Sequence, residues 1–204
     1  MRFFVVLLSL ALLGCQSEIT ENDYFPLQSG INWHYKVSTI KGEIRHNDVF
    51  SITNLDPIRL ELDKESQTVF VRRTSDGTDY YIRRDEEGSY RVAKRTLVEF
   101  KPRYDTEPRQ VLPATHALEV GASWTVESKP YLLHGLKSHS LPDPGKKRFI
   151  LTYEIDEVGA TVIVPAGTFR NCIKVVGTGT LSLYADPRLG YQDVNVIHTE
   201  WYAP

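Results

Sequence analysis

Cysteine is scarce in this sequence and occurs only at Cys15 and Cys172, within 204 residues. Long apolar runs are also missing, because the longest, Phe3–Leu13, contains Ser9 and is too short to span a bilayer. Basic residues do not outnumber acidic ones, with 24 Lys and Arg against 26 Asp and Glu. Beyond the apolar run, no segment has the 3.6-residue period of an amphipathic helix. A disulfide framework, a helical membrane span and a nucleic-acid-binding surface are therefore not expected.

The first residues instead have the anatomy of an export signal. A positive start precedes an apolar core of secretory length, and small Gly14 stands before Cys15. Leu12-Leu13-Gly14-Cys15 resembles the lipobox of bacterial lipoproteins. The resemblance implies that residues 1–14 are a removed signal peptide, and that Cys15 receives a diacylglycerol and then an acyl chain such as palmitate on its amine. The other interpretation is an ordinary cleaved signal with a chance cysteine.

The residue after Cys15 bears on the destination of the chain. Gln16 stands there rather than Asp, and resemblance to Gram-negative sorting then implies the outer membrane, facing the periplasm. Two or three acyl chains anchor durably, whereas one is marginal. Residues 15–23 are polar and predict a short tether. A single β-rich domain is expected over 24–204, with two similar halves at 24–101 and 118–204.

Short alternating strands are expected throughout this domain. Turn-forming Gly, Asp and Pro recur at a spacing of about ten residues, as in an antiparallel meander. The predicted strands cover residues 31–39, 43–52, 58–62, 67–74, 78–84, 89–96, 148–156, 161–164, 173–183 and 193–202, with a further strand around Trp124. Asp56-Pro57 and Glu157–Ala160 are expected to end strands, and Lys101–Leu118 to be irregular because prolines recur in it. The fold class is therefore all-β or β-dominated: a curved antiparallel sheet, as a half-barrel or a sandwich, with at most one or two short helices.

One pattern occurs twice. Leu27–Tyr35 and Leu118–Val126 both read Leu-x-x-Gly-x-x-Trp-x-apolar, although a single recurrence is also compatible with chance. In each copy Gly is expected to turn the chain, and a buried Trp is expected to anchor the new strand in the core. We favour this structural role of the Trp over stacking on a ligand. The structural anchors expected from these and similar turn patterns are Trp33, Trp124, Trp201, Gly30, Gly121, Pro165 and Gly167.

Cys172 is the only thiol left once Cys15 is acylated. Strict alternation over Phe169–Val175 places Cys172 beside Arg170 and Lys174, opposite the apolar face. Free cysteine is nonetheless among the most buried residue types, so a buried thiol is predicted, on a strand covered on both faces. A reactive thiol or a link to a partner is the alternative.

Two segments together resemble a group of uncharacterised bacterial lipoproteins and periplasmic proteins. Tyr24–Tyr35 reads Tyr-Phe-Pro-Leu-x-x-Gly-x-x-Trp-x-Tyr, and Val164–Cys172 reads Val-Pro-Ala-Gly-Thr-Phe-x-x-Cys. The group supplies a label without a mechanism. More loosely, a curved sheet on an acylated exported chain is similar to the Lol-type lipoprotein carriers, whose half-barrels hold acyl chains.

Residues able to carry chemistry are few. His134 and His139 are five apart in a Pro-rich loop, whereas a metal site needs three or four converging ligands, so no metal, cofactor or catalytic residue is predicted. Ser75–Asp79 is acidic but fits a hairpin turn better than a calcium loop. The loop over residues 129–147 is expected to form a short helix or an apolar flap over a ligand, and the flap residues are Tyr131, Leu132, Leu133 and Leu136.

A run of basic side chains follows the meander between Arg72 and Arg95, opposed by acidic turns. It is interpreted as a solvated face with cross-strand pairs, and its sharper alternative is a patch for lipid headgroups.

Three functions remain open from the sequence. The leading hypothesis is a non-enzymatic lipoprotein, anchored through Cys15, whose β-domain binds a hydrophobic ligand, a lipid or an envelope partner. The alternative is a structural or assembly factor of an outer-membrane complex that acts by protein contacts. A hydrolase ranks third, because no triad, carboxylate pair or metal cluster can be assembled.

Overall fold

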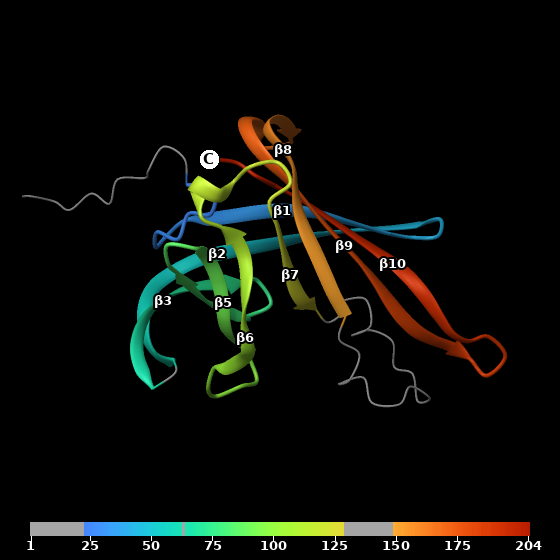
Figure 1. Ribbon diagram of the computed structural model, residues 1–204, viewed down its shortest axis with the longest axis horizontal. Coiled ribbons are helices and arrows are strands. Elements are labelled where there is room, and N and C mark those ends of the chain that lie inside the picture. The colour runs from blue at the N-terminus through green and yellow to red at the C-terminus, as the bar shows by residue number, and fades with distance from the viewer. Residues whose placement is uncertain (1–22, 63, 129–148) are drawn as a thin grey trace, which may run out of the picture.

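The computed structural model describes residues 23–62, 64–128 and 149–204, which form an all-β protein (Figure 1). Its strands are β1 (Asn32–Lys41), β2 (Ile44–Leu62), β3 (Glu65–Thr74), β4 (Asp79–Arg84), β5 (Gly88–Arg95), β6 (Arg103–Pro113), β7 (Ser123–Ser128), β8 (Phe149–Val164), β9 (Gly167–Asp186) and β10 (Gly190–Tyr202). The only helical element in these residues is one 3-10 turn, η1 (Thr115–Ala117), and none of their helices could cross a membrane. The predicted fold class is confirmed.

The strands form two antiparallel sheets. Sheet A has the order β1-β2-β3-β4-β5-β6 and curves into a half-barrel, and sheet B has the order β10-β9-β8-β7. Within each sheet, neighbours along the chain are also neighbours in space, and most of them are joined by short turns, such as the one between Lys41 and Ile44, that favour antiparallel hairpins. Of the two expected shapes, the half-barrel is found, with a second sheet packed on it.

Sheet A carries apolar cores on both faces. Phe70 packs on the core between the two sheets, whereas its chain neighbours Val69 and Val71 lie in a core inside the curve of sheet A. The core between the sheets contains the buried residues Phe25, Leu27, Ile82, Leu112, Ile155, Ile173 and Val175. The core inside the curve contains Leu62, Val69, Val71, Tyr81, Val92 and Ala93. Two-sided burial explains why the strands of the meander have no purely polar face.

Two predicted strand breaks are wrong, because β-bulges stand there instead. β2 continues through Asp56-Pro57, and its register with β3 shifts between Leu55 and Ile58. β8 continues through Glu157–Ala160, where its register with β9 also shifts. A bulge takes in the extra residues and increases the twist without ending the strand, and it tolerates the missing amide of proline.

The predicted irregular segment 101–118 is also wrong over most of its length. It contains β6 and η1. β6 pairs only with β5 in sheet A, with register shifts, so one of its sides needs no hydrogen-bond partner. Proline is tolerated on such an edge strand, which explains why Pro108 does not prevent pairing.

The recurring Leu-x-x-Gly-x-x-Trp motif builds the same structure twice. The Gly30 amide donates to the Asn54 carbonyl at 2.9 Å, and the Asn54 amide returns to Ile31 at 2.9 Å. In the second copy, the Gly121 amide donates to Ile155 at 2.9 Å, and the Ile155 amide returns to Ala122 at 3.0 Å. Both glycines have the positive φ expected of them, +84° and +88°. Each motif therefore hydrogen-bonds the start of its strand to the next long strand.

Cys172 is buried as predicted, through a geometry that alternation did not predict. Asn171 has φ +56°, a left-handed conformation that Asn tolerates, and the register with β8 shifts at Ala160. The consecutive side chains of Cys172 and Ile173 are consequently both buried, at 1% and 0% exposed. Burial raises the pKa of the Cys172 thiol.

Candidate functional site

The strongest candidate site lies where the two sheets converge, around Arg72 on β3. The Arg72 guanidinium stacks on the rings of Phe25 and Trp33, at 4.2 and 4.6 Å from their centroids. Its Nε donates to Asn54 Oδ1 at 3.1 Å. The Asn54 amide donates in turn to the carbonyls of Pro26 and Gln28. The N-terminal segment and the buried Asn54 thus fix the position of the cation.

The charge of Arg72 is unusual for a half-buried group. Burial lowers the pKa of its guanidinium. Among the described residues no carboxylate forms an ion pair with it, whereas Arg73, Arg84, Arg91 and Arg95 each have a carboxylate partner. Aromatic faces stabilise a cation by about 0.5–2 kcal/mol, less than the cost of removing a charge from water. Arg72 is therefore a fixed cation that an anion would stabilise further.

Sheet B contributes a chain of polar aromatic contacts opposite Arg72. Tyr202 Oη donates to Glu200 Oε2 at 2.7 Å, and His198 Nε2 lies 3.7 Å from Glu200 Oε1. Tyr153 Oη and His198 Nδ1 are 2.9 Å apart, and the Tyr153 ring stacks on Trp124 with centroids at 5.6 Å. The five side chains lie on one face of β7, β8 and β10, by the register of these strands.

Two contacts join the halves of the site. Phe25, which lies under Arg72, also packs on Tyr202, with ring centroids 6.4 Å apart. Tyr35 of β1 is close enough to both Arg72 and Glu200 for their charges to act on its phenol. We call this set the Arg72 surface; its residues are Phe25, Trp33, Tyr35, Arg72, Trp124, Tyr153, His198, Glu200 and Tyr202.

The phenols of this surface are held neutral. Burial raises the pKa of Tyr153 to about 12, and burial raises that of Tyr202 well above its ordinary value. Trp124 Nε1 is buried and has no hydrogen-bond partner among the described residues. An unpaired buried donor costs roughly 1–3 kcal/mol, so an acceptor beside this indole would be stabilising.

Two glycines of β9 allow close packing within sheet B beside this surface. A Cβ on Gly177 would stand 2.6 Å from Tyr153 Cε1, and one on Gly179 would stand 2.5 Å from the Ile150 carbonyl oxygen. The Gly-Thr-Gly-Thr sequence at 177–180 therefore makes room for the Tyr153 ring and for close backbone approach within the sheet. It lies inside a strand, which agrees with the sequence argument that it is not a phosphate loop.

Away from Arg72 the apolar faces of the two sheets open to solvent. On β1 the exposed fraction is 44% for Tyr35 and 38% for Val37, and on β10 Val194 is 43% exposed. The β1–β2 and β9–β10 hairpins project from the same side of the molecule, and their tips lie apart (Figure 1). Exposed apolar side chains of β1 and β10 therefore continue from the Arg72 surface along the two hairpins.

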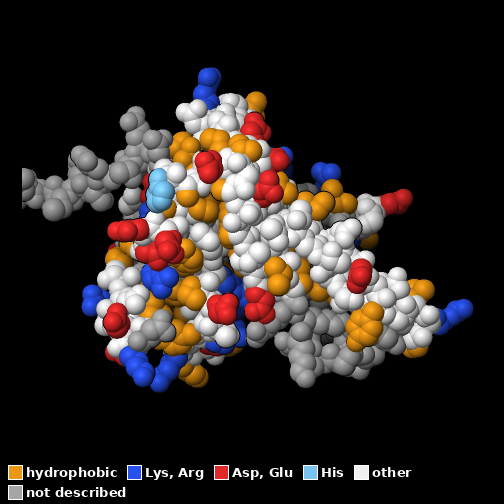
Figure 2. All heavy atoms as spheres, in the orientation of Figure 1, with side chains coloured by type: hydrophobic (Ala, Val, Ile, Leu, Met, Phe, Trp, Pro, Cys, Tyr) orange, Lys and Arg blue, Asp and Glu red, His pale blue; other side chains and the backbone are white. Residues whose placement is uncertain are grey.

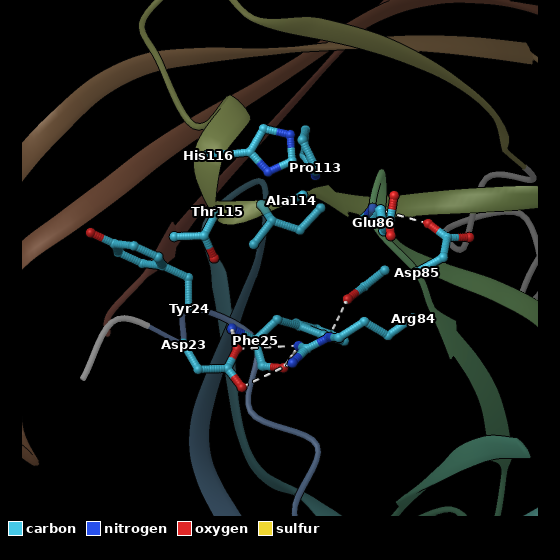
Figure 3. Close-up of a pocket in the computed structure, with 13 residues that line it drawn as sticks. Asp23, Tyr24, Phe25, Arg84, Asp85, Glu86, Pro113, Ala114, Thr115 and His116 are labelled. Atoms are coloured by element: carbon cyan, nitrogen blue, oxygen red, sulfur yellow. Dashed lines mark hydrogen bonds and ion pairs between the residues drawn. The ribbon is translucent and has the colours of Figure 1, made fainter. Parts of the chain in front are cut away.

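A hollow of about 590 Å³ lies where the N-terminal segment meets sheet A (Figure 3). Arg84 dominates it: its guanidinium donates to both Asp23 carboxylate oxygens at 3.0 and 3.2 Å, to the Phe25 carbonyl, and to Ser89 Oγ at 3.1 Å. His116 and Glu86 lie at its rim, directed away from these bonds. Because the Arg84 bonds are made within the chain, we interpret this hollow as the fastening of the N-terminal segment.

The anchors expected from the sequence have different positions. Trp33 and Trp124 are half-buried rather than buried, and both belong to the Arg72 surface. Trp201 is 50% exposed and pairs with Lys174 on the opposite face of β10, so its indole lies outside the core. Pro165 lies in the turn between β8 and β9, where Gly167 has φ +143°.

Several expected residues lie outside the described ranges. These are the lipidation residue Cys15 and the flap residues Tyr131, Leu132, Leu133 and Leu136. The ends that flank residues 129–148, Ser128 and Phe149, pair with each other at the edge of sheet B. Sequence reasoning did not single out Arg72, Tyr153, His198 or Tyr202 as site residues. A signal was present only for Arg72, which belongs to the basic run already noted.

Within residues 23–62, 64–128 and 149–204, no group of three or more His, Cys, Asp and Glu side chains could hold a metal ion. Comparison with known proteins adds no assignment: no protein-family model, curated protein or solved structure matches this chain.

Proposed function

We propose that this protein is an envelope lipoprotein that binds an amphiphile, with an acyl chain and an anionic group, on the Arg72 surface. It acts without catalysis, anchored through Cys15 in the outer membrane and facing the periplasm. The lipobox and Gln16 support the location. The curved sheet and the aromatic and exposed apolar side chains around Arg72 support the ligand class, because sites for small ligands are mostly apolar and set with a few polar groups.

One observation carries this proposal: Arg72 is a half-buried cation without a carboxylate partner among the described residues, held between two aromatic rings. A carboxylate or phosphate of a ligand would supply the missing charge through bidentate hydrogen bonds. The acyl chain would then lie on exposed apolar side chains such as Val37 and Val194. The exposed Tyr35 offers a further polar contact.

Fluorescent fatty-acid binding tests the proposal on the full exported chain, made free of its own lipid by Cys15→Ser. Arg72→Gln should weaken binding about tenfold or more, since a hydrogen bond to a charged group contributes roughly 1.5–3 kcal/mol. Arg45→Gln is the matched control, because Arg45 is exposed on β2 and the substitution removes the same charge. Equal affinities for the two variants would contradict the Arg72 site, and no binding to any of the three chains would contradict the ligand class.

The anchor is tested separately by fractionation. Cys15→Ser should let a high-salt wash move the chain from the membrane fraction to the soluble periplasmic fraction, because the thiol that carries the diacylglycerol is lost. A Cys15→Ser chain that stays with the membrane in high salt would contradict anchoring through this residue.

The alternative, an assembly factor that works by protein contacts, is favoured by the hairpin tips. Ile40 and Ile44 are 59% and 74% exposed on one hairpin, and Leu189 and Tyr191 are 62% and 58% exposed on the other. Photo-crosslinkers at Ile44 and Leu189 in the anchored chain should capture one outer-membrane protein if this alternative holds. The control is the same probe at Ile163, which is exposed near the end of β8 and pairs with the start of β9, away from the β9–β10 turn.

A further inference from the structure

The connection between β5 and β6, residues 96–102, displays the most exposed large hydrophobic side chains of the described residues. Leu97 is 81% exposed, Val98 86% and Phe100 98%. Scattered exposed apolar side chains are normal on a protein surface, but three within four residues make a local patch. We call Leu97, Val98 and Phe100 the apolar tip.

The loop that carries the apolar tip has a fixed shape. Glu99 Oε2 accepts hydrogen bonds from the Thr96 amide at 2.7 Å and from Thr96 Oγ1 at 2.9 Å. The Glu99 amide donates back to the Thr96 carbonyl at 3.0 Å, and Arg103 Nε lies 3.2 Å from Glu99 Oε1. The Glu99 side chain therefore caps the Thr96 amide, as the acidic residue of a capping box does, and closes the loop. These bonds fix the loop with all three apolar side chains exposed, and Leu97 lies beside Gly77 in the turn before β4.

Basic side chains surround the apolar tip. Residues 94–103 contain Lys94, Arg95, Lys101 and Arg103 against one acidic residue, Glu99, in a chain whose net charge is −2. Burial lowers the pKa of Lys94, and repulsion from Arg103 and Arg91 lowers it further. Arg95 and Arg103 pair with Asp79 and Glu99, whereas no ion pair joins Lys94 or the exposed Lys101 to a carboxylate among the described residues, so these two lysines could pair with anions from outside. Basic and hydrophobic side chains meet at the lower end of the half-barrel in Figure 2.

We propose that the apolar tip inserts into the headgroup layer of a bilayer that contains anionic phospholipid. Apolar side chains at the end of a loop enter the boundary between headgroups and acyl chains, and Lys and Arg behind them reach the phosphates while their stems stay in the apolar layer. The charge of the loop complements such a surface. This membrane contact goes beyond the ligand site at Arg72 and stands independently of it.

The position of the tip separates it from the entry of the N-terminal segment. Gly88, at the start of β5, lines the hollow that also contains Asp23, and the tip follows the other end of β5. Eight strand residues at about 3.3 Å each place these ends roughly 25 Å apart. The eight Cα–Cα steps from Cys15 to Asp23 reach at most about 28 Å when extended. A lipid on Cys15 and the apolar tip can therefore meet the same membrane.

Vesicle co-sedimentation of the full Cys15→Ser chain tests the contact. We expect binding to vesicles of phosphatidylethanolamine and phosphatidylglycerol, and about tenfold weaker binding for the Leu97→Ser, Phe100→Ser double variant. Ile163→Ser, which removes a comparably exposed side chain elsewhere, should bind like the parent. Lys94→Gln with Lys101→Gln should also weaken binding and reduce its salt dependence. The Leu97→Ser, Phe100→Ser double variant should keep the fatty-acid affinity of the parent, which separates this contact from the ligand site.

A second measurement reports insertion directly. Val98→Trp should gain a blue-shifted emission with anionic vesicles, quenched by brominated lipid, relative to the parent with its three tryptophans. Equal partitioning of the parent and the double variant would overturn the proposal, as would absence of binding to anionic vesicles. A photo-crosslink from Val98 to a protein, with no vesicle binding, would also overturn it and identify the tip as a protein contact.

Discussion

The Tyr153 ring lies directly against the backbone of Gly177, so closely that a Cβ at position 177 would stand 2.6 Å from Tyr153 Cε1. The same ring stacks on Trp124 and contacts His198, so the glycine sets the position of an aromatic stack that spans three strands. Gly179, two residues on, makes a different close approach, to the backbone carbonyl of Ile150. A smaller side chain at position 153 should therefore make room for a methyl group at position 177 but not at position 179.

Gly177→Ala and Gly179→Ala should each lower the free energy of unfolding by about 1–3 kcal/mol, because each new methyl group overpacks the sheet. Tyr153→Leu should recover part of the loss at Gly177, since the ring is what the methyl meets. It should recover nothing at Gly179, where the obstacle is the Ile150 carbonyl. Double-mutant cycles in urea measure both couplings. A coupling of Tyr153 to both glycines, or to neither, would contradict the assignment.

Asp79→Asn should lower the free energy of unfolding at pH 7 by about 1–3 kcal/mol. The Asp79 carboxylate is 1% exposed and accepts hydrogen bonds from Arg73 Nε at 2.6 Å and Arg95 Nη2 at 2.6 Å. Burial alone would raise its pKa, but the two guanidinium groups hold the pKa below the ordinary Asp value. The folded state therefore binds the Asp79 proton less tightly than the unfolded state does.

The pH dependence of this effect has a definite sign. The stability that Asp79 contributes is complete above the ordinary Asp pKa of about 3.9 and is lost as the pH falls through the lower folded pKa. The difference between parent and Asp79→Asn should accordingly shrink between pH 5 and the acid limit of folding, as urea midpoints will show. Asp193→Asn, at an exposed position on β10, is the matched control and should change neither value by more than about 0.5 kcal/mol.

Alkaline titration should reveal the buried phenol of Tyr153. Burial raises its pKa to about 12, so the folded state keeps the phenol neutral after the unfolded state has begun to ionise near pH 10. The contribution of this phenol to stability is complete below pH 10 and is lost between about pH 10 and 12. Tyr153→Phe should therefore lose less stability than the parent from pH 9 to pH 11 in urea unfolding. Equal losses would show that Tyr153 ionises normally in the folded chain.

The Cys172 thiol should be unreactive in the folded protein. It is 1% exposed and burial raises its pKa, so both access and the thiolate fraction are low. In the Cys15→Ser chain, Ellman's reagent should react with Cys172 only once urea unfolds the domain. Fast reaction in the native state would instead mark Cys172 as a reactive thiol.

Local sequence signals predicted the fold class and many strand positions because hairpin turns are encoded locally. Gly30, Gly42 and Gly121 take the positive φ that their turns require. The signals failed where strands continue through bulges, at Asp56-Pro57 and Glu157–Ala160, since a turn signal and a bulge signal use the same residues. β6 was not predicted because its prolines hide the strand pattern in the sequence. The segment forms a strand by pairing with β5, which local sequence does not reveal.

The candidate site was predicted less well than the fold. Trp33 and Trp124 were singled out as core anchors, and the structure places them on one surface through contacts made by β3, β8 and β10. Arg72 looked like one more cation of a solvated run, because nothing in its neighbours along the chain shows that Phe25, 47 residues away, lies under it. Long-range stacking of this kind is set by tertiary packing and leaves no periodic signal.

The Arg84 fastening has a mechanical consequence. A pull on the chain upstream of Asp23 is received by the Asp23–Arg84 ion pair and by the bond from Arg84 to the Phe25 carbonyl, before any core side chain moves. Arg84 belongs to β4, which is hydrogen-bonded to β3 on one side and β5 on the other. Tension is therefore shared by two strand interfaces that must yield together, and the N-terminal segment can act as a tether under load without peeling an edge strand from the sheet.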